Sequence, residues 1–185
     1  MSKEPKPKKI NFELIPPNGK HESYRLMDEI RSKHHKQLEP ARIAIAWRKS
    51  LKPNVDGQLI LGKCVKASDL NREAAPYDFI ILLNREVWQD MDFNEKKKRA
   101  LLDHELCHAE IVLDKDTHEP KYDERGRNIW RLRKHDIEEF QGVIERHGCY
   151  KRDLEKFAQA LLKKRNESPL LPGMDKPAEK EKVLQ

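Results

Sequence analysis

The chain has 185 residues, of which 37% are hydrophobic and 38% are charged, with a formal net charge of +6. This length suits one domain with tails, and the low apolar fraction indicates that part of the charge lies outside a packed core. No apolar run approaches the roughly 20 residues that cross a bilayer, and no secretory signal is evident, so we expect a cytoplasmic protein without membrane contact. The positive charge is spread along the chain, which makes DNA only a weakly indicated partner.

Proline, glycine and lysine mark both ends of the chain. Residues 1–20 hold Gly19 and several prolines among lysines, a composition that cannot support a helix or bury much apolar surface. Residues 167–185 have the same character. We therefore predict two flexible tails, 1–20 and 167–185, around a single domain formed by residues 21–166.

The central region predicts one helix, then three strands, then further helices. The first helix covers 22–38 and stops before Pro40. Short alternating apolar runs with turn signals between them favour a small, mainly antiparallel sheet with strands at 41–47, 58–66 and 78–83. The remaining apolar patterns predict helices at 93–113, 136–146 and 152–164, which makes the fold class α+β.

The helix predicted over 93–113 begins with a possible capping box, Asp92 with Glu95, and carries the sequence His104-Glu105-Leu106-Cys107-His108. Two histidines four residues apart lie on one helix face, one turn apart, as two ligands of a single zinc ion do. Zinc held by neutral imidazoles lowers the pKa of bound water from about 16 to about 7. Glu105 borders such an ion and can take the proton, which indicates hydrolysis with Glu105 as the catalytic base.

Apolar residues surround this motif on most sides of the helix, so we expect the helix to be buried. Burying two histidines and a glutamate without partners would be costly, and a metal ion supplies a partner. Cys107 is expected to be a small buried side chain rather than a ligand. The surrounding apolar residues are Leu101, Leu102, Leu106, Ala109, Ile111, Val112 and Leu113.

A catalytic zinc site also needs a third protein ligand from elsewhere in the chain. The three cysteines are far apart and form no C-x-x-C pair, so they predict neither a disulfide framework nor a zinc ribbon. Among downstream histidines, His118 suits a surface loop and His147 suits a helix end. His135 directly precedes a predicted helix and is the preferred ligand, with Glu138 and Glu139 as alternatives.

Three stretches together are similar to a known family. They are Ile80-Ile81-Leu82-Leu83-Asn84, the residues 101–110 around the HExxH motif, and His135-Asp136-Ile137-Glu138-Glu139-Phe140. They resemble the SprT-like zinc metallopeptidases and, more closely, the putative phage metallopeptidase domain, over about residues 22–164.

The resemblance implies a zincin-like fold, with His104, His108 and His135 on one zinc ion and Glu105 as the catalytic base. It also implies a polypeptide substrate. SprT-like relatives often cleave proteins associated with DNA. This chain lacks the C-terminal cysteine ribbon that many of them carry, so DNA targeting does not transfer with the resemblance.

A zinc endopeptidase is therefore the leading hypothesis, and two alternatives stay open. The first is a regulatory peptidase of the ImmA type, with Glu138 or Glu139 as the third ligand. The second is a zinc-stabilised module that binds nucleic acid without turnover, although a structural site has no need of the base Glu105. For a peptidase, we expect an extended substrate to pair with strand 78–83 as an exposed sheet edge.

Overall fold

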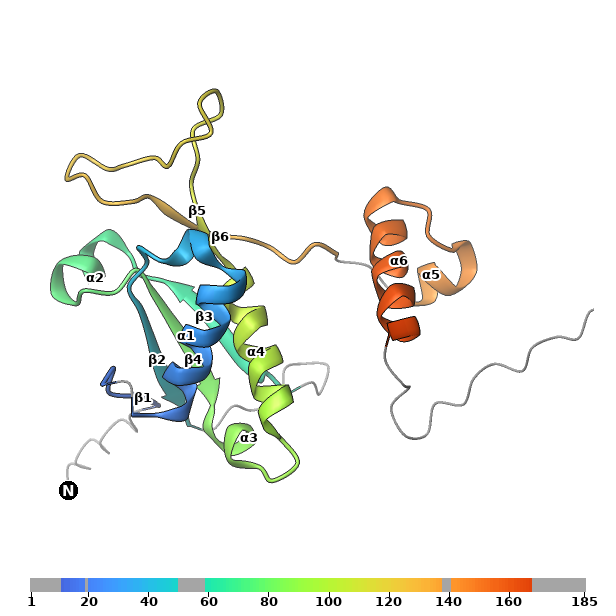
Figure 1. Cartoon of the computed structure of the whole chain (residues 1–185), viewed down its shortest axis with the longest axis horizontal. Helices are drawn as coiled ribbons and strands as arrows, with labels where there is room; N and C mark the ends of the chain where they lie inside the picture. Colours follow the sequence, from blue (N-terminus) through green and yellow to red (C-terminus); the bar gives the residue numbers. More distant parts are fainter. Residues whose placement is uncertain (1–10, 19, 50–58, 138–140, 168–185) are drawn as a thin grey trace, which may run out of the picture. The chain divides into compact units, whose positions relative to one another are not determined.

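The computed structural model describes residues 11–18, 20–49, 59–137 and 141–167 (Figure 1). It divides into two compact units, residues 1–134 and residues 135–185, and each is described by itself. Within the described residues the chain is a mixed α+β structure with six α-helices. The α+β class predicted from the sequence is confirmed, whereas the tail and domain boundaries stay predictions.

A four-stranded mixed sheet forms the base of the first unit, in the order β1-β2-β4-β3. Its strands are β1 (Phe12–Leu14), β2 (Ile43–Arg48), β3 (Gly62–Lys66) and β4 (Phe79–Asn84). The two central strands β2 and β4 run parallel, while β1 and β3 join them antiparallel at the edges. The three predicted strands are present as β2, β3 and β4. The sequence did not predict β1, because its three residues are too few to show an alternating pattern.

Strand β1 lies in the segment that the sequence assigns to a flexible tail. Leu14 pairs with Ala46 of β2, and the side chain of Ile15 is only 2% exposed. The hydroxyl of Tyr24 donates a hydrogen bond of 3.0 Å to the carbonyl of Ile15. Pro16 and Pro17 follow the strand instead of interrupting it, and residues 11–15 are part of the packed unit. Residues 1–10 and 168–185 lie outside the described residues.

Two long helices, α1 (Glu22–His34) and α4 (Glu95–Cys107), pack against each other and contribute to the core beneath them (Figure 1). The short helices η1 (Lys36–Leu38), α2 (Asp69–Ala74) and α3 (Arg85–Gln89) connect the elements. The predicted first helix is confirmed as α1 followed by η1. The core combines apolar residues of both long helices and of the sheet, including Leu26, Met27, Ile30, Ile45, Phe79, Ile81, Leu83, Leu102 and Leu106.

Helix α4 is shorter than the predicted 93–113 helix. After Cys107 the chain turns into strand β5 (Ala109–Ile111), which pairs with β6 (Trp130–Leu132). A short apolar run has no period that separates helix from strand, and β-branched residues favour the strand. The chain between them continues as a hairpin with bridges Leu113–Pro120 and Tyr122–Asn128.

The second unit contains α5 (Gln141–His147) and α6 (Arg152–Glu167). Helix α6 confirms the prediction for 152–164, and it buries Leu154. The helix predicted to start at Asp136 does not do so, because residues 135–137 are not helical. Residues 138–140 lie outside the described residues. No helix in the described part of the chain is long and apolar enough to cross a membrane.

The N-terminal cap of α4 gives a test of this fold. The side chain of Asn94 accepts a hydrogen bond of 3.1 Å from the backbone N–H of Lys97, so Asn94 caps the helix in place of the predicted Asp92. Asn94→Ala should lower the free energy of unfolding by about 0.5–2 kcal/mol, measured by urea denaturation. Asp92→Ala is the matched control and should change it by less than about 0.5 kcal/mol. The reverse ranking would contradict the observed helix start.

Candidate metal centre

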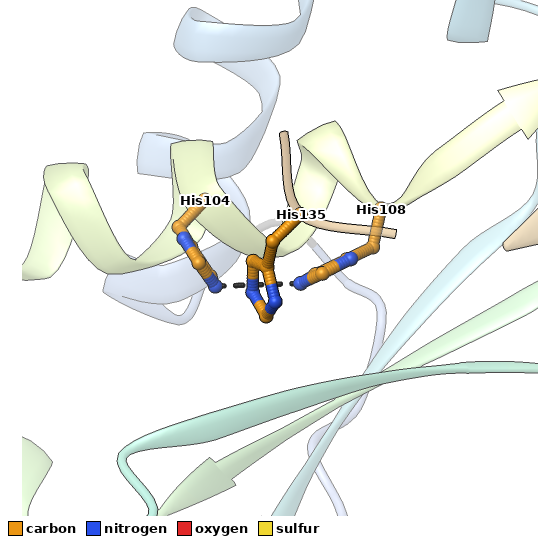
Figure 2. Close-up of side chains that lie close together, drawn as sticks. All are labelled: His104, His108 and His135. Carbon is orange, nitrogen blue, oxygen red and sulfur yellow. Dashed lines mark hydrogen bonds between the residues drawn. The ribbon is translucent and has the colours of Figure 1, made fainter. Parts of the chain in front are cut away.

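The imidazoles of His104 and His108 converge at the C-terminal end of α4 (Figure 2). Their Nε2 atoms are 3.3 Å apart. Two nitrogen ligands at about 2.0–2.1 Å from a tetrahedral zinc ion are separated by about 3.3–3.4 Å. The pair is therefore already spaced as two ligands of one ion, and the prediction that these side chains share one face is confirmed.

Backbone contacts fix the orientation of the His108 ring. Its Nδ1 lies 2.7 Å from the carbonyl oxygen of Arg133, and the N–H of Arg133 donates to the carbonyl of His108 at 2.8 Å. A carbonyl can only accept, so Nδ1 must carry the proton and donate it. The lone pair of the neutral ring is then on Nε2, the atom that faces His104. Such a bond on the far nitrogen is typical of metal-binding histidines.

His135 follows Arg133 by two residues. The ligand atoms of His104, His108 and His135 all lie within 4.8 Å of one another, and Figure 2 shows the three rings gathered. His135 is the first residue of the second unit. Its role as a ligand stays a prediction. The alternatives Glu138 and Glu139 lie outside the described residues.

Glu105 occupies a different environment from the two histidines. Its side chain is buried between α4 and β3, with the residue 3% exposed. Burial raises the pKa of its carboxyl group, while the backbone N–H of Cys64 and the nearby His108 lower it. A carboxylate with a raised pKa and one fixed donor is suited to accept a proton.

Gly62 makes room for this carboxylate. A Cβ atom at position 62 would lie 2.7 Å from Oε1 of Glu105 and 3.1 Å from Cδ1 of Leu101. Strand β3 can approach α4 only because residue 62 has no side chain. A glycine inside a strand is the sequence signal for such a close approach.

The exposure of the motif differs from expectation. Glu105 is buried, but His104 is exposed and His108 is only partly buried. The burial argument for a metal thus applies to the glutamate and not to the two imidazoles. Cys107 is exposed, so its prediction as a buried side chain is wrong. The reason is that α4 packs with one face only, and the histidines and Cys107 lie at the margins of that face.

A pocket opens beside His104 and Glu105, with a volume of about 640 Å³. Its wall is mainly apolar and is formed by Leu61, Gly62, Phe93, Lys97, Ala100 and Leu101. The edge strand next to the site is β3, because β4 is paired on both sides. The expectation of an exposed edge at 78–83 is therefore wrong, and sequence reasoning missed the roles of Gly62, Cys64 and Arg133. No sequence signal pointed to Arg133, which acts through its backbone.

A histidine pair with a buried glutamate on an α+β scaffold defines a candidate hydrolytic metal centre. The family model described as putative phage metallopeptidase matches residues 18–162, and the chain belongs to this family. The resemblance to phage metallopeptidases is thereby confirmed, and the narrower SprT-like relationship is compatible with it. A search of curated proteins and a search of solved structures each returned no match.

The contact between Gly62 and Glu105 can be tested without any assay of activity. Gly62 does not have a positive φ, so alanine is strained there only by the contact. Gly62→Ala should lower the free energy of unfolding by about 1–3 kcal/mol. In a Glu105→Ala background the carboxylate is absent and the loss should be smaller, with a coupling of at least about 0.5 kcal/mol in a double-mutant cycle. Additive effects would show that the two positions do not touch.

Proposed function

We propose that this chain is a zinc-dependent metallopeptidase that hydrolyses peptide bonds, with a zincin-like site. His104, His108 and His135 are the proposed ligands of one zinc ion, and Glu105 is the proposed catalytic base. The observation that carries the proposal is the 3.3 Å approach of the Nε2 atoms of His104 and His108, with Glu105 adjacent on the same helix.

The donor set fits the metal. Three neutral imidazoles leave the charge of a zinc ion intact, and the contact between His108 and Arg133 presents one lone pair in the required direction. When bound there, zinc supplies a Lewis acid that acidifies water and polarises a carbonyl group. The exposure of His104 keeps the site open to solvent and substrate.

Glu105 performs the proton transfer in this proposal. Its carboxylate accepts a proton from the attacking water and later delivers that proton to the leaving amine. The N–H of Cys64 holds the carboxylate, and Gly62 lets it lie against β3. Both contacts come from one edge strand, so the base is positioned by backbone and not by mobile side chains.

The same edge strand suits a polypeptide substrate. At one end of the strand the carbonyl of Leu61 accepts a hydrogen bond of 2.9 Å from the N–H of Asn84. At the other end the N–H of Ala67 donates one of 2.9 Å to the backbone carbonyl of Asp78. Bonded pairs alternate along an antiparallel ladder, so the peptide groups of the intervening even-numbered residues face away from β4. Among these, the N–H of Cys64 is already bonded to Glu105. An extended peptide can pair with the other groups of this edge, and the adjacent apolar pocket can receive one of its side chains.

Glu105→Gln tests the mechanism. The amide cannot accept the proton, so cleavage of an unfolded protein should fall by a factor of about 10²–10⁴ while zinc content stays the same. Glu95→Gln is the matched control, because Glu95 lies on the same helix with its side chain half-exposed, paired with Arg99. Cleavage by Glu105→Gln at the level of the Glu95→Gln control would reject the assigned base.

Substitution of the third ligand distinguishes the zinc endopeptidase hypothesis from the ImmA-type hypothesis. His135→Ala should lower the bound zinc by one equivalent, measured by elemental analysis after dialysis, whereas His118→Ala should leave the zinc content unchanged. Loss of zinc on Glu138→Gln or Glu139→Gln, with retention in His135→Ala, would instead favour an ImmA-type regulatory peptidase. Zinc retention without any cleavage by the unaltered chain would favour a non-catalytic module, for which salt-dependent DNA binding is the further measurement.

A further inference from the structure

A second group of metal-ligating side chains lies where the end of α1 meets α4. His35, Asp103 and Cys107 each present one ligand atom, and these atoms all lie within 4.8 Å of one another. All three residues belong to the first unit. Asp103 and Cys107 are four residues apart on α4, as His104 and His108 are. Asp103 directly precedes His104, and Cys107 directly precedes His108. The pair Asp103 and Cys107 therefore lies about 100° around the helix from the histidine pair.

His35 is held in place before any ion arrives. Its N–H donates to the carbonyl of Arg31 at 2.9 Å, and its own carbonyl accepts from Leu38 at 2.9 Å. The residue is 6% exposed, and its Nε2 lies 2.6 Å from Oδ1 of Asp103. The imidazole therefore points from the junction of α1 and η1 toward α4, with its ring nitrogen at the cluster.

The other two side chains keep the cluster accessible. The side chain of Asp103 is 47% exposed, and Cys107 is an exposed residue. Ligands of a tetrahedral zinc ion are about 3.3 Å or more apart, so Asp103 must withdraw from His35 by less than about 1 Å to share an ion with it. An exposed carboxylate on a helix surface can make that movement by rotating its side chain.

The chemistry of the three donors selects the ion. Imidazole, carboxylate and thiolate are the three ligand types that zinc uses in proteins, and the thiolate favours thiophilic metals over Mg²⁺ or Ca²⁺. Carboxylate and thiolate together carry two negative charges, which neutralise a divalent cation. Three protein ligands leave one position for water.

We propose that His35, Asp103 and Cys107 form a second binding site for a thiophilic divalent cation such as Zn²⁺. The site is distinct from the one proposed at His104 and His108, and it goes beyond the single ion expected from the sequence. An ion held there ties the C-terminal end of α1 to the helix that carries the HExxH motif. Binding only to the folded chain stabilises it by mass action.

The test counts metal ions bound to the full chain. Metal-free protein is titrated with Co²⁺ and, separately, with Zn²⁺, and the bound equivalents and the thiolate-to-cobalt charge-transfer absorption are recorded. The unaltered chain should bind two equivalents and show the absorption. Cys107→Ser should bind one and lose the absorption, whereas the control Cys149→Ser should keep both. The double variant His104→Ala with His108→Ala should bind one equivalent and keep the absorption.

A second variant, at Asp103, tests the site in case Cys107→Ser does not fold. Asp103→Asn retains the size of the exposed side chain and should also lose one equivalent, while circular dichroism reports that the protein is folded. The proposal is overturned if Cys107→Ser and Asp103→Asn bind as many ions as the unaltered chain, or if the double histidine variant binds none. A single equivalent that survives in the double histidine variant but not in Cys107→Ser would support this site and reject the histidine centre.

Discussion

The reciprocal contact between His108 and Arg133 is the constraint on which the site depends. The hydrogen bond from the N–H of Arg133 to the carbonyl of His108 fixes where the chain after β6 meets the end of α4. The bond from His108 Nδ1 to the Arg133 carbonyl fixes the tautomer and direction of the ring. One pair of residues thus lies at the end of the helix and fixes the orientation of the proposed ligand His108.

The edge strand β3 provides the second half of the site. Gly62 removes the steric barrier between strand and helix, and the N–H of Cys64 gives the buried carboxylate of Glu105 a donor. A buried carboxylate without a donor would be costly, so the two contacts explain how Glu105 is tolerated in this position. The Cys64 thiol is itself buried, and this burial raises its pKa to about 12, so the thiol stays neutral beside Glu105.

Helix α4 connects these features because its faces carry different chemistry. Its apolar face enters the core through Leu102 and Leu106, which are both fully buried. The histidine pair and the neighbouring pair Asp103 and Cys107 lie at the margins of that packed face. In each proposed site two ligands are four residues apart, so the geometry of the regular helix sets the distance between them. The packing of α1 on α4 brings His35 to the proposed site at Asp103 and Cys107.

The sequence alone is enough to predict the α+β class, the helix with HExxH and the family, because helical spacing and residue chemistry are local properties. It did not determine that α4 ends at Cys107, that β1 joins the sheet, or that β3 and not β4 is the edge beside the helix. Nor did it identify the backbone of Arg133 or the approach of His35 to Asp103. Tertiary structure decided these features, because strand neighbours and backbone hydrogen bonds join residues that are distant in the chain and leave no periodic trace in it.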